Sequence, residues 1–150
     1  MIKGENRYMK FKDVTLNDIK EYFDDNDYDY GLVHADYNKK NPEILNIFRF
    51  DGEIDDNNTY ICGVYKNKYN DIVVQTETAT SPLNYGIGYI EDEEEVSVEK
   101  IISMIMSYAK SGICENIDFQ KRQIEFINDF GKQCGLEIDS ITTTTGNKYE

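Results

Sequence analysis

His34 is the only histidine in the chain and the first residue that could take part in acid–base or nucleophilic chemistry. If its segment, residues 31–37, forms a strand, His34 and Asp36 share one face because side chains alternate along a strand. A carboxylate that orients an imidazole is the arrangement of a general base, so a small hydrolase or nucleotide-processing enzyme using this pair is one hypothesis. No G-x-S-x-G elbow and no cysteine-protease signature accompanies the pair. A polar surface strand is therefore favoured over a catalytic one, and we expect no enzymatic activity.

Metal and phosphate sites need ligands at fixed spacings, which this sequence lacks. Zinc sites use closely spaced pairs of Cys or His, whereas Cys62, Cys114, Cys134 and His34 are scattered. The acidic segment 51–58 does not have the spacing of a calcium loop, because its glycine follows the first acid directly. Gly86-Ile-Gly88 lacks the third glycine of a dinucleotide-binding turn, and there is no Walker motif. We expect no metal and no cofactor.

Carboxylates are the most abundant polar groups, with 29 acidic against 16 basic residues and a net charge of −13. They cluster in three segments, of which the first and third are the candidate partner-binding residues. The second segment is Asp51, Glu53, Asp55 and Asp56. The first segment supplies Asp24, Asp25, Asp27, Tyr28, Asp29 and Tyr30. The third supplies Glu91, Asp92, Glu93, Glu94 and Glu95.

Such a charge repels phosphate backbones and anionic membranes, so direct binding to nucleic acid or to a membrane is disfavoured. It favours a basic protein partner, although high solubility alone is another explanation. Acidic runs repel themselves unless a cation or a basic partner relieves them. Carboxylates with tyrosines between them could present the charge pattern of a nucleic-acid backbone to a protein that normally binds one. Tyrosine is also a favoured anchor in interfaces.

Hydrophobic periodicity predicts the elements that must position these residues. A helix is expected from an N-cap at Thr15 to about Asp24. Strands are expected at Tyr30–Tyr37, Ile44–Phe50, Thr59–Tyr65, Asp71–Thr78 and Tyr85–Ile90, with Tyr60, Cys62 and Val64 on one face. Two helices follow, one capped by Ser97 and ending at Gly112, the other from about 117 or 118 to Cys134, and the tail at Ser140–Thr145 could add a strand.

A block of strands followed by a block of helices predicts one α+β domain over residues 1–150. Its fold class is an N-terminal helix, an antiparallel sheet of about five strands and two C-terminal helices packed on one face. The expected core residues come from the helices and the strands alike: Ile101, Ile105, Phe126, Ile127, Phe130, Ile47, Val64, Val73 and Ile87.

Three cysteines without a C-x-x-C pair indicate free thiols in a reducing compartment. No signal peptide is evident, so we expect a cytoplasmic protein of a bacterial or phage-infected cell. In size and composition the chain resembles the small acidic inhibitors of phages and mobile elements. These include DNA-mimicking anti-restriction and anti-CRISPR proteins and the immunity proteins that neutralise a basic nuclease. The resemblance implies inhibition of a basic nucleic-acid-binding protein, while a phage structural or assembly subunit is the alternative.

Overall fold

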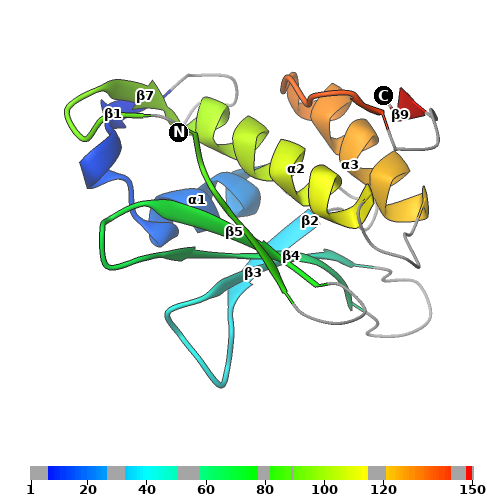
Figure 1. Cartoon of the computed structure of the whole chain (residues 1–150), viewed down its shortest axis with the longest axis horizontal. Helices are drawn as coiled ribbons and strands as arrows, with labels where there is room; N and C mark the ends of the chain where they lie inside the picture. Colours follow the sequence, from blue (N-terminus) through cyan, green and yellow to red (C-terminus); the bar gives the residue numbers. More distant parts are fainter. Residues whose placement is uncertain are drawn as a thin grey trace.

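Three helices lie on one face of a five-stranded antiparallel sheet in the computed structural model (Figure 1). The structure describes residues 7–26, 33–50, 58–77, 82–88, 90–114, 121–142 and 148–149. The helices are α1 (Leu16–Asp25), α2 (Val98–Cys114) and α3 (Lys121–Cys134). Helix α1 contacts β2 and β4, and α2 contacts β4 and β5, so the predicted α+β class is confirmed.

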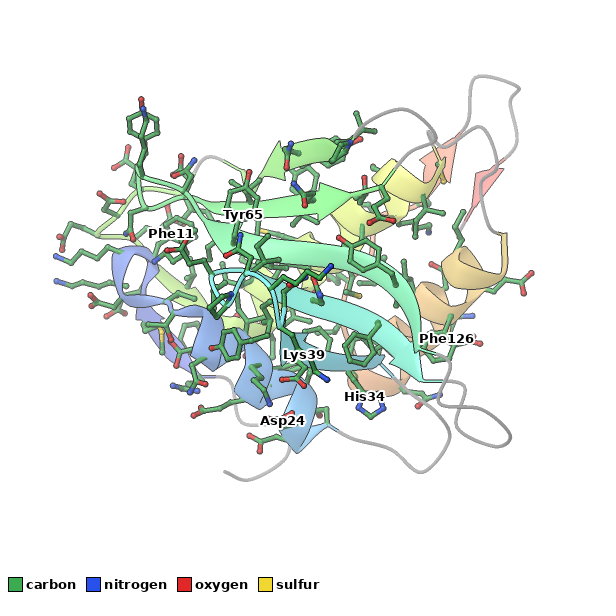
Figure 2. The ribbon with its side chains drawn as sticks, turned by 90° about the horizontal axis from the view of Figure 1, so that it is seen from below. Phe11, Asp24, His34, Lys39, Tyr65 and Phe126 are labelled. Atoms are coloured by element: carbon green, nitrogen blue, oxygen red, sulfur yellow. The ribbon has the colours of Figure 1, made fainter. Side chains whose placement is uncertain are left out.

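The main sheet is a meander in which each strand pairs with the next one along the chain. Its strands are β2 (Val33–Tyr37), β3 (Leu45–Phe50), β4 (Asn58–Lys66), β5 (Ile72–Thr76) and β6 (Leu83–Gly86), in the order β2-β3-β4-β5-β6. Figure 2 looks onto the outer face of this sheet, which no helix of the described residues covers.

Two short strand pairs accompany the sheet. The first joins β1 (Tyr8–Lys10) to β7 (Glu95–Ser97), and a 3-10 turn, η1 (Phe11–Asp13), follows β1. The second joins β8 (Ile141–Thr142) to β9 (Lys148–Tyr149), which confirms the beginning of the strand expected in the tail; residues 143–145 lie outside the described part. The β1–β7 pair was not predicted from the sequence, although it fixes one of the acidic segments.

Helix α1 forms where its capping signals predict. The Thr15 hydroxyl accepts a hydrogen bond from the Asp18 amide at 3.2 Å, and the Asp18 carboxylate accepts one from the Thr15 amide at 2.9 Å, which completes a capping box. At the other end the Asn26 side chain donates to the Tyr22 carbonyl at 2.8 Å. The Asn26 backbone amide donates to the same carbonyl at 3.1 Å, so Asn26 caps the helix with both its backbone and its side chain, and α1 ends at Asp25.

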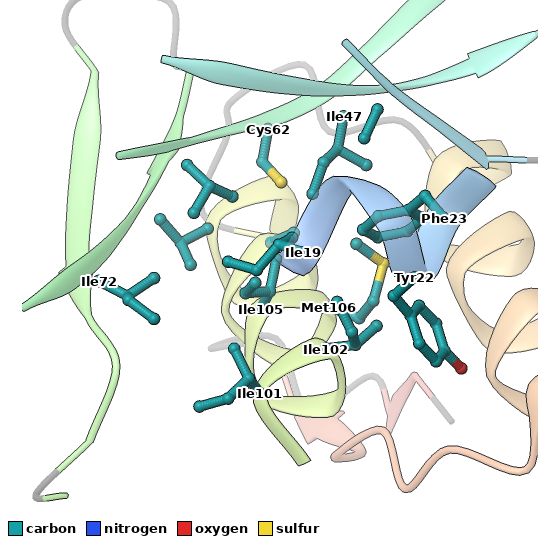
Figure 3. Packing of buried hydrophobic residues seen from close by; sticks show 14 of the residues in the cluster. Ile19, Tyr22, Phe23, Ile47, Cys62, Ile72, Ile101, Ile102, Ile105 and Met106 are labelled. Carbon is teal, nitrogen blue, oxygen red and sulfur yellow. The ribbon is translucent and has the colours of Figure 1, made fainter. Parts of the chain in front are cut away.

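The core fills the space between the sheet and the helices (Figure 3). Most of the predicted core residues are buried there, namely Ile47, Val64, Ile87, Ile101, Ile105, Ile127 and Phe130. Phe126 is only partly buried at its edge. Val73 is buried but lies outside this cluster, because it alternates with the core-facing residues Ile72 and Val74.

The sheet departs from the predicted pattern in two places. A bulge in β4 pairs Cys62 with Ile47 but Tyr60 with Phe48, so Ile61 is an extra residue and the alternation shifts. Cys62 and Val64 face the core, whereas Tyr60 lies on the outer face, so the expectation of a shared face was wrong for Tyr60. The fifth strand spans Leu83–Gly86 rather than Tyr85–Ile90, and the backbone turns at Gly88, whose φ is +26°.

None of the helices in the described ranges has the length and apolar character needed to span a bilayer.

Candidate partner-binding surface and pocket

The acidic run Glu91–Glu95 forms the connection into β7, and all five of its residues are exposed. Strand β1 and the turn after it fix the backbone of the run. The amide of Phe11 donates to the Glu94 carbonyl at 2.9 Å, and the amide of Lys12 donates to the Asp92 carbonyl at 3.0 Å. The run is therefore held in place rather than projecting as a free tail.

One carboxylate of this run is neutralised within the protein. Glu93 accepts from Lys10 at 2.8 Å and from Lys12 at 2.5 Å, and these hydrogen bonds lower the pKa of its carboxyl. In the described part of the chain no ion pair reaches the four other carboxylates of the run. Four of the five acids therefore carry negative charges that no ion pair among the described residues neutralises.

The other described acids of the candidate set, Asp24 and Asp25, form the last turn of α1. No basic residue occupies this turn, although the partial negative charge at a helix C-terminus favours cations there. Lys20 offsets Asp24 through an i,i+4 pair at 2.8 Å, but Asp25 has no ion pair among the described residues. Asp27, Tyr28, Asp29 and Tyr30 lie outside the described residues, as does the second acidic segment at 51–56.

The two acidic sites lie beyond opposite ends of α1. Arg7, next to β1, pairs with Asp18 and Glu21 in the first part of the helix, and Asp24 and Asp25 close its far end. Figure 2 shows Asp24 well separated from Phe11, which bonds to the run at 91–95. A helix of ten residues is about 15 Å long. A partner must therefore either cover both sites with a broad surface or use one of them.

A pocket of about 920 Å³ opens beside the acidic end of α1. Its walls come from three places: the end of α1, one side of α2 and the segment that follows α3. The helix α1 contributes Tyr22, Asp25 and Asn26, and α2 contributes Glu99, Lys100, Ser103, Met104, Ser107, Tyr108 and Ser111. The third wall consists of Cys134, the last residue of α3, and of Gly135, Leu136, Glu137 and Asp139 after it, and Ser97 completes the lining.

The third wall is fastened to α2 by hydrogen bonds. The Asp139 amide donates to the Ser107 hydroxyl at 3.0 Å, and the Asp139 carbonyl accepts from the Lys110 ammonium at 3.1 Å. Lys110 is fully buried and also donates to the Asn128 side chain at 2.9 Å, so it links α2, α3 and the segment after α3. These bonds give the pocket a preformed shape.

The lining of the pocket is negatively charged, and one of its residues carries an unused acceptor. Among its described lining residues four carry carboxylates, Asp25, Glu99, Glu137 and Asp139, against the single cation Lys100. The Oε2 atom of Glu99 is shielded from solvent and has no hydrogen-bond partner among the described residues. Buried acceptors are normally satisfied, so this oxygen is suited to a donor that comes from outside the chain.

Sequence reasoning missed the pocket, although one signal was available. Ser103, Ser107 and Ser111 recur every four residues along α2, which places hydroxyl groups along one face of the helix. The opposite face carries the predicted core residues. Nothing local indicated that the end of α1 and the segment after α3 would enclose this stripe, because both contacts are distant in sequence.

The two residues of the histidine hypothesis, His34 and Asp36, lie on the outer face of the sheet. His34 (Figure 2) stacks on Phe48 with ring centroids 5.9 Å apart. Because side chains alternate along a strand, Asp36 is on the same face of β2, as expected. Cys62 lies on the opposite face, in the core, where burial raises the pKa of its thiol. Cys62 and His34 therefore cannot form a nucleophile–base pair across the sheet. No cluster of three possible metal ligands occurs among the described residues.

We expect Cys62 to resist iodoacetamide at neutral pH, whereas the partly exposed Cys114 and Cys134 are alkylated first. The reactive species is the thiolate, and burial both hides the Cys62 sulfur and disfavours its charged form. Peptide mass spectrometry after timed alkylation measures the order. Equal labelling of all three cysteines in the folded protein would show that β4 is not buried as described.

The same burial predicts a loss of stability at alkaline pH. The pKa of Cys62 is raised above its ordinary value of 9.0 in the folded state. The free energy of unfolding therefore has its full value with respect to this group below pH 9. As pH rises above 9, the unfolded chain releases this proton while the folded chain retains it, and the free energy of unfolding falls. Urea titrations of the wild-type protein and of Cys62→Ala over this range isolate the contribution, which the variant lacks.

No protein-family model, curated protein or solved structure matches the chain. The acidic surface and the pocket beside it are therefore the features from which a function can be inferred.

Proposed function

We propose that this protein binds a basic nucleic-acid-binding protein, such as a nuclease, in the cytoplasm of a bacterial or phage-infected cell and inhibits it by occupying its nucleic-acid site. The observation that carries the proposal is the pair of carboxylates, Asp24 and Asp25, at the C-terminal end of α1. They stand next to a pocket whose lining is itself acidic.

Carboxylates at the C-terminal end of a helix oppose its dipole, which favours positive charge there. A carboxylate in the last turn costs about 0.3–1 kcal/mol through the helix dipole, and Lys20 offsets only the charge of Asp24. Residues that violate local rules without an internal compensation are found most often where function requires them. A partner that supplies Lys or Arg side chains would remove the repulsion and satisfy the carboxylates.

Inhibition would be competitive, because carboxylates replace phosphates against the same basic residues. The run at 91–95 supplies a second negative site with four unpaired carboxylates in a fixed backbone. Tyr28 and Tyr30, which alternate with Asp27 and Asp29 in the sequence, are the aromatic anchors of the proposal. A net charge of −13 steers a basic partner towards this surface over long range.

The test begins with capture of the partner from host lysate and its identification by mass spectrometry. With the purified partner, we expect the association rate to fall several-fold between low salt and about 0.15 M salt, because the Debye length shortens to about 8 Å. The complex should also exclude an oligonucleotide that the partner binds alone. A complex that is indifferent to salt and still binds the oligonucleotide would mean that the protein does not act by occupying the nucleic-acid site.

A further inference from the structure

We propose that the pocket between the end of α1, α2 and the segment after α3 receives an arginine side chain of the basic partner, with the Glu99 carboxylate as its principal acceptor. This inference rests on the proposed function and names the contact that would hold the partner once charge attraction has brought it near.

The first argument is the unused acceptor. Glu99 lies in the first turn of α2, and its Oε2 atom is shielded from water without a donor from the described residues. Leaving a buried acceptor without a hydrogen bond is unfavourable, and more so when the group is charged. The last side-chain torsion of a glutamate has a broad, roughly two-fold preference, so a carboxylate on the pocket wall can adjust its orientation towards an incoming donor.

The second argument is the sign of the charge. The N-terminus of α2 alone would favour an anion, but the carboxylates of Asp25, Glu137 and Asp139 outnumber the single ammonium of Lys100 in the described lining. A phosphate group would meet this negative lining, whereas a cation would be stabilised by it. The pocket is therefore suited to a positively charged group rather than to a nucleotide.

The third argument selects arginine over lysine. Acceptors in the pocket are spread over two walls, with carboxylates at Glu99 and Asp25 and hydroxyl oxygens at Ser103 and Ser107. A guanidinium has five N–H donors in a planar fork and is weakly hydrated, so it can satisfy several separated acceptors as it leaves water. An ammonium is more strongly hydrated and directs its three donors from one atom.

The fourth argument is size and position. A volume of about 920 Å³ is near the upper end of the range for pockets that enclose small molecules, so an arginine can enter together with part of its own chain. Asp25 belongs both to the pocket wall and to the acidic end of α1. An arginine attracted by the surface acids therefore reaches the pocket without leaving the negative region, as expected of a buried anchor at an interface.

The direct test uses N-acetyl-L-arginine amide as the probe and N-acetyl-L-citrulline amide, its uncharged near-isostere, as the control. In amide NMR spectra of the wild-type protein, the arginine probe is expected to shift the signals of Ser103, Ser107 and Leu136 in a saturable manner. The citrulline probe is expected to shift them at least about tenfold less at the same concentration, because it lacks the charge. Glu99→Gln should reduce the response to arginine to that of citrulline.

Three results would overturn the inference. Equal shifts with both probes would show that charge is not recognised. Shifts confined to the exposed acids at 91–95 would show surface attraction without a pocket. A full response in Glu99→Gln would exclude Glu99 as the principal acceptor. The comparison of the two probes needs no variant, so it stands even if Glu99→Gln fails to fold.

Measurements with the partner separate this inference from the proposed function. Loss of one member of a buried charge pair acts mainly on dissociation, so Glu99→Gln is expected to release the partner about thirtyfold faster or more while the salt dependence of association is unchanged. If association is salt-sensitive but Glu99→Gln dissociates like the wild-type protein, only the pocket inference fails. If the arginine probe binds in the pocket but the partner ignores salt and surface acids, the inhibitory mechanism fails and the arginine site remains.

Discussion

A variant carrying Asp24→Asn and Asp25→Asn is expected to associate with the basic partner about tenfold more slowly than the wild-type protein, while being at least as stable on its own. Stopped-flow or surface-binding kinetics measure the association rate, and urea unfolding measures the stability. The combination of slower association with undiminished stability distinguishes a functional surface from a structural one.

The two substitutions differ in their expected effect on stability. Asp25 opposes the helix dipole without an ion pair among the described residues, so Asp25→Asn alone is expected to stabilise the protein by about 0.3–1 kcal/mol. Asp24 opposes the same dipole but pairs with Lys20, and the loss of an i,i+4 pair costs about 0.3–0.5 kcal/mol. Asp24→Asn is therefore expected to be nearly neutral.

A matched control removes two negative charges elsewhere. Glu43→Gln together with Asp71→Asn makes the same change in net charge at exposed positions outside both acidic sites. If net charge alone steers the partner, the control and the test variant slow association equally, and the proposed role of the end of α1 is wrong. If only the test variant is slow, the position of the charges matters. A test variant that is clearly less stable would mean that these acids have a structural role instead.

Sequence reasoning succeeded where the signal was local. The capping box of Thr15 and Asp18 lies within four residues, and the alternation or 3.6-residue period of each element lies within ten or so. These patterns identified the three helices and the five-stranded meander, because each depends on neighbours along the chain. The same reasoning failed at Tyr60, since an extra residue in β4 shifts the alternation without any local mark in the sequence.

The candidate surface depended on contacts that no local pattern reveals. The five consecutive acids at 91–95 give no local sign that one of them is neutralised, but Lys10 and Lys12 reach Glu93 across about eighty positions of sequence through the β1–β7 pair. The pocket likewise requires Asp25, Glu99 and Asp139 to meet from three distant segments. Composition indicated that the protein is acidic, and tertiary contacts decide which of the acids remain available to a partner.

Gly112→Ala is expected to destabilise the protein by about 1–3 kcal/mol, although alanine is the better helix former. Gly112 lies in the last turns of α2, where the helix crosses β5 at close range. A Cβ atom at this position would stand 2.2 Å from Thr76 Oγ1 and 2.5 Å from Thr76 Cγ2, so the helix or the strand must move. Urea unfolding gives the change in the free energy of unfolding.

Two further variants assign this loss to the contact between α2 and β5. All three of the nearest atoms belong to the Thr76 side chain, so Gly112→Ala should cost far less in a Thr76→Gly background. Gly86→Ala adds the same methyl group where no atom lies within 4 Å, and it is expected to change stability by less than about 0.5 kcal/mol. Because α2 also carries Glu99 and the serine face of the pocket, displacement of the helix by Gly112→Ala should weaken the response to the arginine probe, and Thr76→Gly should restore it. An equal loss of stability in both backgrounds would show that the close approach of α2 to β5 is not what requires glycine at this position.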